Sequence, residues 1–128
     1  MLTEKQELRL SPLGHTWVLD FDGTLVVHNG YKTGEDEFLP GALSFLRSIP
    51  AQDYVLIITA REKEARAKTE AFLQKHGVRY NEILFEMPMG ERILINDDKP
   101  SGLRCAYALT PTRNQGLENV SVVIDEKL

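Results

Sequence analysis

Residues 16–25 read TWVLDFDGTL, an apolar run that ends in two aspartates. The run has the length of a short strand, and Gly23 then favours a turn. Asp20 and Asp22 are two residues apart, so their side chains point to the same side of an extended chain. Two carboxylates this close repel each other unless a cation lies near them. The stretch therefore predicts a strand that presents an acidic pair, suited to Mg²⁺, at its carboxyl end.

The rest of the chain alternates between short apolar runs and amphipathic stretches. Strands are predicted at residues 54–59, 83–85, 92–96, 105–109 and 120–124, and helices at 40–49 and 61–76. This alternation predicts a single α/β domain over residues 1–128, with a mainly parallel central sheet between layers of helices. No internal repeat or low-complexity linker interrupts it.

One segment departs from the alternation. Asn29-Gly30 is the favoured pair for a tight type I′ turn, and short extended stretches flank it. An acidic run, Glu35-Asp36-Glu37, follows. We expect a β-hairpin flap over about residues 25–37, and a plain surface loop is the alternative.

Composition limits the classes of partner. A formal net charge of −4 and a pI near 5.4 argue against a surface built to bind nucleic acid. Cys105 is the single cysteine, so no intramolecular disulfide can form, which fits a cytoplasmic location. No apolar run approaches the roughly 20 residues that a membrane span requires. We therefore expect a cytoplasmic protein with no membrane partner.

Further polar groups follow two other predicted strands. Asp97 and Asp98 follow one strand, and Thr59 ends another. The carboxyl ends of parallel strands lie at one edge of a sheet, where ligands bind in open α/β folds. Thr59 and the backbone of Ala60 precede a predicted helix, a position that suits a phosphate group. Each motif alone could be an ordinary turn, but three in this order favour one site near Asp20.

These motifs resemble those of the haloacid dehalogenase (HAD) superfamily. Residues 20–25, DFDGTL, match its DxDGT signature, residues 57–61, IITAR, are similar to its second motif, and residues 95–98, INDD, to its fourth. The resemblance spans residues 16 to about 100. It implies a three-layer Rossmann-like sandwich. Because only the flap follows the first motif, the chain resembles the capless branch.

The resemblance also implies a mechanism. Asp20 would attack phosphorus and form an aspartyl-phosphate, and Asp22 would serve as general acid and then general base. Thr59 and Ala60 would hold the phosphoryl group. Asp97 would bind Mg²⁺ together with Asp20 and the backbone carbonyl of Asp22. The implied activity is magnesium-dependent hydrolysis of a phosphate monoester.

The third motif of the family departs from the usual pattern. It is normally a lysine, but residues 85–91, FEMPMGE, contain none. Lys99 is the first candidate for the missing positive charge, with Lys63 and Arg61 as alternatives. Residues expected around this centre, orienting the metal or touching the substrate, are Asp98, Arg61 and His28.

Without a cap, the site would be open. That suits a bulky phosphorylated substrate, or a homo-oligomer in which a neighbouring subunit covers the site. The expected substrate is a sugar phosphate or other small metabolite. A phosphotransferase would use the same nucleophile and is the rival enzyme class. A non-catalytic binding or regulatory module with a HAD fold is the rival outside enzymes, favoured only by the irregular third motif.

Overall fold

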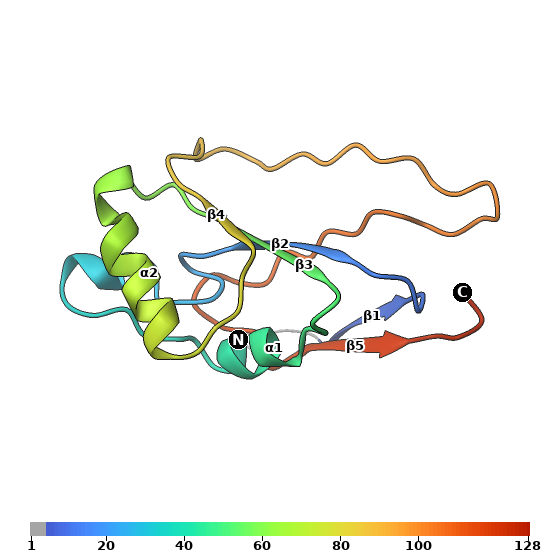
Figure 1. The fold of residues 1–128 in the computed structure, drawn as a ribbon, viewed down its shortest axis with the longest axis horizontal. Coiled ribbons are helices and arrows are strands. Elements are labelled where there is room, and N and C mark those ends of the chain that lie inside the picture. The colour runs from blue at the N-terminus through green and yellow to red at the C-terminus, as the bar shows by residue number, and fades with distance from the viewer. Residues whose placement is uncertain (1–4) are drawn as a thin grey trace.

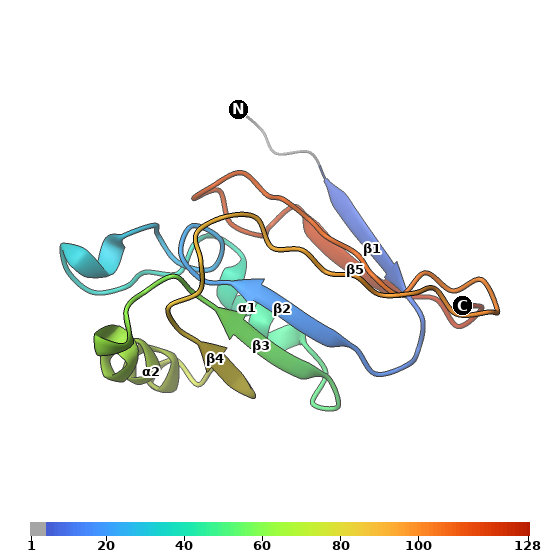
Figure 2. The same ribbon diagram turned by 90° about the horizontal axis from the view of Figure 1, so that it is seen from above.

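The computed structural model describes residues 5–128, and Figures 1 and 2 show their path. The strands are β1 (Gln6–Leu10), β2 (Thr16–Asp20), β3 (Tyr54–Ile58), β4 (Glu82–Leu84) and β5 (Val120–Ile124). The helices are α1 (Ala42–Ser48) and α2 (Arg66–Lys75), and 3₁₀ turns form at η1 (Gly30–Lys32) and η2 (Lys63–Ala65). Both predicted helices are confirmed: α1 lies within two residues of the predicted ends, whereas α2 begins five residues later than predicted, after the 3₁₀ turn η2, and ends one residue earlier. Within the described range, no helix is long and apolar enough to cross a membrane.

The strands form two parallel sheets. β2, β3 and β4 make one sheet in that order, and β1 pairs with β5 in the other. Asp20 stands opposite Ile58 in the β2–β3 ladder, so both strands end at the same edge. The predicted α/β class with parallel strands is confirmed. The strands are divided between two sheets, however, and do not form one central sheet.

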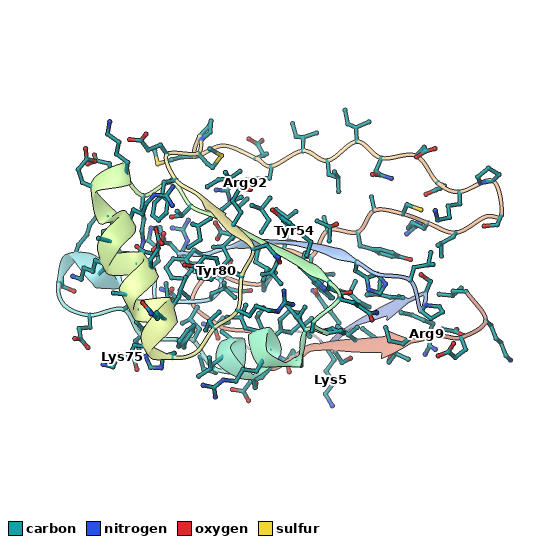
Figure 3. All side chains as sticks on the ribbon, viewed as in Figure 1. Lys5, Arg9, Tyr54, Lys75, Tyr80 and Arg92 are labelled. Atoms are coloured by element: carbon teal, nitrogen blue, oxygen red, sulfur yellow. The ribbon has the colours of Figure 1, made fainter. Side chains whose placement is uncertain are left out.

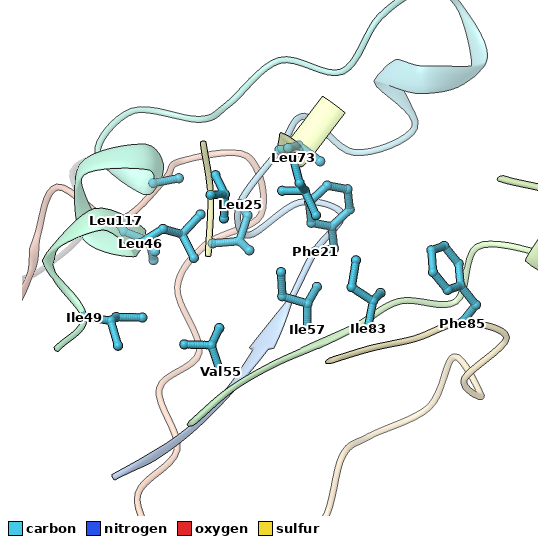
Figure 4. Close-up of a cluster of buried hydrophobic side chains, with 13 residues drawn as sticks. Phe21, Leu25, Leu46, Ile49, Val55, Ile57, Leu73, Ile83, Phe85 and Leu117 are labelled. Atoms are coloured by element: carbon cyan, nitrogen blue, oxygen red, sulfur yellow. The ribbon is translucent and has the colours of Figure 1, made fainter. Parts of the chain in front are cut away.

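Both helices pack on one face of the β2–β3–β4 sheet. Val55 and Ile57, two residues apart on β3, point into the same buried cluster as Leu46 of α1 and Leu73 of α2 (Figure 4). Burying each such side chain contributes about 1.5–3 kcal/mol. Val18 lies on the other face and is 51% exposed. The described residues therefore form a sheet with one layer of helices, which positions the strand ends but leaves the second face open.

The predicted strands at 92–96 and 105–109 are wrong. The chain between β4 and β5 contains no helix or strand. Its mostly exposed residues 86–110 form a long excursion away from the rest of the molecule (Figure 1). Ile93 and Ile95 are 82% and 92% exposed. An apolar run becomes a strand only when a neighbouring strand pairs with it. Residues 92–96 make no backbone–backbone hydrogen bond, so the ladder is missing.

The predicted tight hairpin is also wrong. Val26 and Phe38 form an isolated antiparallel bridge, and the chain between them is a broad loop that carries η1. A type I′ turn needs positive φ at both central residues. Asn29 has φ 60°, but Gly30 enters the 3₁₀ turn without a positive φ. The segment is therefore a wide loop with a short antiparallel base.

Asp53, whose side chain is fully buried, joins the segment before β3 to β2. Its carboxylate accepts hydrogen bonds from Trp17 Nε1 at 2.9 Å and from the backbone N–H of His15 at 3.0 Å. Burial by itself raises the pKa of Asp53. The hydrogen bonds from Trp17 and His15 and the charge of His15 lower it by more, so the net pKa lies below its ordinary value.

We predict that Asp53→Asn destabilises the protein most at neutral pH. A carboxyl group whose pKa is lowered on folding contributes stability above its unfolded pKa, about 4, and loses it as pH falls through the folded value. The variant should lose about 1.5–3 kcal/mol near pH 7, and the difference from wild type should shrink below about pH 4. Urea unfolding between pH 3 and 7 measures this. The exposed control Glu126→Gln should follow wild type, and a pH-independent gap for Asp53→Asn would contradict the prediction.

Candidate active site

The ends of β2 and β3 bring three of the predicted residues together. Asp20 ends β2, Asp22 follows two residues later, and Thr59 comes directly after β3. The Thr59 hydroxyl donates to Asp22 Oδ2 at 2.9 Å and links the two strand ends. The Thr24 hydroxyl donates to Asp20 Oδ2 at 2.9 Å. The Asp20 side chain is 35% exposed, so its carboxylate can be reached from solvent.

A tight turn holds the acidic pair in place. The carbonyl of Phe21 accepts the backbone N–H groups of Leu25 and Val26, at 2.9 and 3.2 Å. Gly23 has φ 86°, a conformation that L side chains rarely adopt. Phe21 itself is fully buried. The turn therefore anchors in the core while the two aspartates flanking Phe21 stay at the sheet edge.

Arg61 is the centre of a buried polar network beside this turn. Its guanidinium lies in contact with two carboxylates, at 2.8 Å from Asp22 Oδ1 and 2.7 Å from Asp36 Oδ1. A further bond goes to the Thr69 hydroxyl of α2 at 2.9 Å. The Arg61 and Asp36 side chains are each 1% exposed. One buried arginine thus joins β3, the turn after β2, the wide loop and α2.

All five N–H donors of Arg61 are used within this network. Nε donates to Asp22, Nη1 to Asp36 and Thr69, and Nη2 to both aspartates. The guanidinium also lies over the rings of Phe21 and Tyr31, with 4.7 and 3.8 Å to the ring centroids. Since an arginine has five donors, none remains for a phosphate. Arg61 is therefore a positioning residue for Asp22 in this geometry.

The pKa of Arg61 follows from this environment. Burial by itself lowers the pKa of Arg61. The hydrogen bonds to Asp36 and Asp22 and their negative charges raise it by more, so the net pKa lies above its ordinary value. Arg61 stays charged wherever the protein is folded. Asp36 was not predicted from the sequence, because its neighbours Glu35 and Glu37 are exposed and the three together resemble a solvated acidic run.

Arg92 supplies a positive charge at Asp20. Its Nη1 lies 3.0 Å from Asp20 Oδ1, and the side chain reaches back from the segment after β4 (Figure 3). The sequence analysis placed Arg92 at the start of a strand and did not consider it. A signal was present, since Arg92 is the only basic residue between the short third strand and the second acidic pair.

The Thr59 hydroxyl and the backbone N–H of Ala60 lie next to each other directly after β3. The Thr59 hydroxyl accepts the backbone N–H of Arg61 at 3.1 Å, which curves the chain after β3. Ala60 is exposed, and its backbone N–H has no hydrogen-bond partner in the described part of the chain. An unpaired N–H beside a hydroxyl can donate a hydrogen bond to a phosphate oxygen.

The second acidic pair lies elsewhere in this structure. Asp97, Asp98 and Lys99 are exposed on the long excursion, and none contacts Asp20 or Asp22. Asp98 instead accepts the backbone N–H of Cys105 at 3.2 Å. Among residues 5–128, no group of three or more His, Cys, Asp or Glu side chains is arranged to hold a metal ion. The donor set predicted for Mg²⁺ is therefore incomplete as the residues are placed.

His28 and Lys63 lie around the site without reaching the carboxylates. The backbone N–H of His28 donates to Asn114 Oδ1 at 2.9 Å, and its Nδ1 is buried with no partner among the described residues. The backbone N–H of Lys63 donates to Glu86 Oε2 at 3.4 Å. Neither side chain forms an ion pair with Asp20 or Asp22.

The site is an open sheet edge and not a deep pocket. A cavity of about 630 Å³ does exist, but it lies between α1, β2 and β5. Its lining includes Trp17, Phe45 and Val122, and none of the residues at the carboxylate pair. A substrate at Asp20 would therefore be approached from solvent.

Comparison with known proteins gives a partial likeness in fold. No protein-family model and no curated protein matches the chain. A chain in the solved structure of a Pnkp1/Rnl/Hen1 complex is similar, with 26% sequence identity and a TM-score of 0.50. The match covers 64% of the present chain and 31% of that chain. The likeness therefore concerns the arrangement of part of the fold, and it assigns neither a family nor an activity.

Proposed function

We propose that this protein is a phosphohydrolase that cleaves phosphate monoesters at the edge formed by β2 and β3. The observation that carries the proposal is the hydrogen bond from Thr59 to Asp22, which fixes the two strand ends beside the half-exposed carboxylate of Asp20. A reachable carboxylate, a second carboxylate held in one orientation and an adjacent free N–H are the groups that phosphoryl transfer through a covalent intermediate requires.

The proposed reaction has two steps. An oxygen of Asp20 attacks phosphorus, the bond from phosphorus to the ester oxygen breaks, and Asp22 gives that oxygen a proton. Water then attacks the aspartyl-phosphate, Asp22 takes the proton of the water, and phosphate leaves with Asp20 restored. Arg61 holds Asp22 in position throughout, as its contacts at 2.8–3.2 Å indicate.

Arg92 is proposed to reduce the repulsion between Asp20 and an incoming phosphate dianion. It is the cation in contact with Asp20, at 3.0 Å. Lys99 stays a prediction for the same role, because its side chain makes no contact with the site residues as placed.

Dependence on Mg²⁺ is part of the proposal on the sequence argument alone. Asp20 and Asp22 supply two carboxylates, and Mg²⁺ accepts one or two with waters and substrate oxygens. The predicted third ligand, Asp97, lies on the exposed segment after β4, apart from these two carboxylates. The finer fold, a capless three-layer Rossmann-like sandwich, is likewise a proposal that follows from the motifs. The cytoplasmic location is a proposal that follows from the single cysteine and the short apolar runs.

Phosphate release from a panel of substrates tests the proposed function. The panel contains an aryl phosphate, sugar phosphates, a phosphopeptide and a phosphorylated oligonucleotide, each with Mg²⁺ and with EDTA. We expect release above the uncatalysed rate for at least one substrate, lost in EDTA and restored by Mg²⁺. Release that persists in EDTA would remove the metal from the proposal. No release from any substrate would contradict hydrolysis and favour transfer to another acceptor or a binding module.

A further inference from the structure

We propose that Arg113 binds the phosphoryl group of the substrate. The inference rests on the proposed function, since it assigns the anion-binding residue of that same site. It begins from the segment before β5, which passes beside the turn after β2 in both views of the ribbon (Figures 1 and 2).

This segment is attached to the turn by two hydrogen bonds of Asn114. Its backbone N–H donates to the carbonyl of Gly23 at 2.8 Å, and its side-chain Oδ1 accepts the N–H of His28 at 2.9 Å. Asn114 has φ 64°, and the N–H of Gln115 closes a turn on Thr112 at 3.1 Å. The backbone on both sides of Arg113 is therefore held in place, and its position over the turn is a product of the fold.

Arg113 lies directly against Gly23, the residue after Asp22. A Cβ atom at position 23 would meet Arg113 Cγ at 3.1 Å and Nε at 3.5 Å. The side chain thus passes over the backbone of the acidic turn at van der Waals distance. Its Nε, part of the charged guanidinium, therefore lies beside the turn that carries Asp22.

The charges at this edge leave Arg113 without a partner. Arg61 is saturated by Asp22 and Asp36, and Arg92 is paired with Asp20. Arg113 is exposed, and its guanidinium forms no hydrogen bond or ion pair with any residue of the described chain. Of the three arginines at the site, Arg113 alone has all five donors available to a ligand.

A phosphoryl group is the ligand that matches this arrangement. A guanidinium presents parallel N–H donors that bind two phosphate oxygens at once, which a lysine ammonium cannot do. A phosphate at Asp20 would need a compensating cation, because the phosphoryl group and the nucleophilic Asp20 carboxylate are both anionic. Arg113 would supply that charge from its position beside Gly23.

The test measures binding of inorganic phosphate by calorimetry and turnover of the best panel substrate, in wild type and three variants. Arg113→Gln should weaken phosphate binding and raise KM roughly 10- to 100-fold, with a smaller effect on kcat. Arg113→Lys should fall between wild type and Arg113→Gln. Arg104→Gln is the matched control, an exposed arginine without an ion pair on the long excursion, and should bind phosphate like wild type. Unfolding midpoints should agree in all four proteins.

The outcomes separate this inference from the proposed function. Weaker phosphate binding in Arg113→Gln alone supports the inference, even if no substrate is turned over, and in that case hydrolysis fails while the anion site stands. Turnover with unchanged KM and unchanged phosphate binding in Arg113→Gln overturns the inference and leaves hydrolysis intact. Absence of phosphate binding in the wild type, or equal weakening in Arg104→Gln, also overturns it.

Discussion

Asp20→Asn is expected to lower turnover of any substrate by about 10³-fold or more, because the amide removes the nucleophile on which both steps depend. The change replaces one carboxylate oxygen by nitrogen at a half-exposed position, so the fold should survive. The hydrogen bond from Thr24 can still be accepted by the amide oxygen. Phosphate release by the purified variant, beside its urea unfolding curve, measures both expectations.

The matched control for this prediction is Asp125→Asn, an aspartate after β5 in the other sheet. Its carboxylate pairs with Arg9 at 3.6 Å, a surface contact worth about 0–1 kcal/mol. The control should retain wild-type turnover. Turnover by Asp20→Asn at the wild-type rate would remove Asp20 as nucleophile, and loss of turnover together with unfolding would assign it a structural role instead.

The sequence was sufficient to predict those parts of the site that depend on local pattern. β2 and β3 are short β-branched or apolar runs that a turn or a polar residue ends, so their limits are legible without a structure. Parallel pairing then requires that both strands end at one edge. The approach of Thr59 to Asp22 follows from these two facts alone. In the structure, the Thr59 hydroxyl donates a hydrogen bond to Asp22 Oδ2 at 2.9 Å.

The incorrect predictions concern pairing between segments that lie far apart in the chain. Residues 92–96 have the composition of a strand, but composition does not state whether an edge is available to pair with them. The Asn29-Gly30 pair favours a tight turn, yet the contact of Tyr31 with Arg61 draws the loop into a wider path. In both cases a non-local contact, present or missing, outweighs a local preference.

The Arg61–Asp36 pair shows why the buried network escaped prediction. The two residues are 25 positions apart, and nothing local distinguishes Asp36 from its acidic neighbours. From the sequence, Arg61 was expected as an alternative phosphate-binding cation or as a residue around the metal centre. Its actual role depends on Thr69, Asp22 and Asp36 meeting in space, which only the packed structure reveals.

The second large effect is expected from Arg61→Met, which should lower the free energy of unfolding by about 3–5 kcal/mol. Methionine has similar length but cannot pair with carboxylates, so Asp36, whose side chain is 1% exposed, would keep an uncompensated charge in the interior. Asp22 would lose the donors that orient it. Urea unfolding measures the stability, and kcat in the folded fraction measures the loss of orientation.

Three further variants decide whether the buried charge causes the loss. Arg61→Met combined with Asp36→Asn should recover part of the stability, because the double variant removes the uncompensated carboxylate as well as its partner. Arg61→Lys should lie between wild type and Arg61→Met, since it keeps the charge but cannot form paired bonds. Arg66→Met, at an exposed pair with Glu70, should change stability by no more than about 0.5 kcal/mol. If the double variant is no more stable than Arg61→Met, packing against Phe21 and Tyr31, rather than charge, is what Arg61 contributes to the fold.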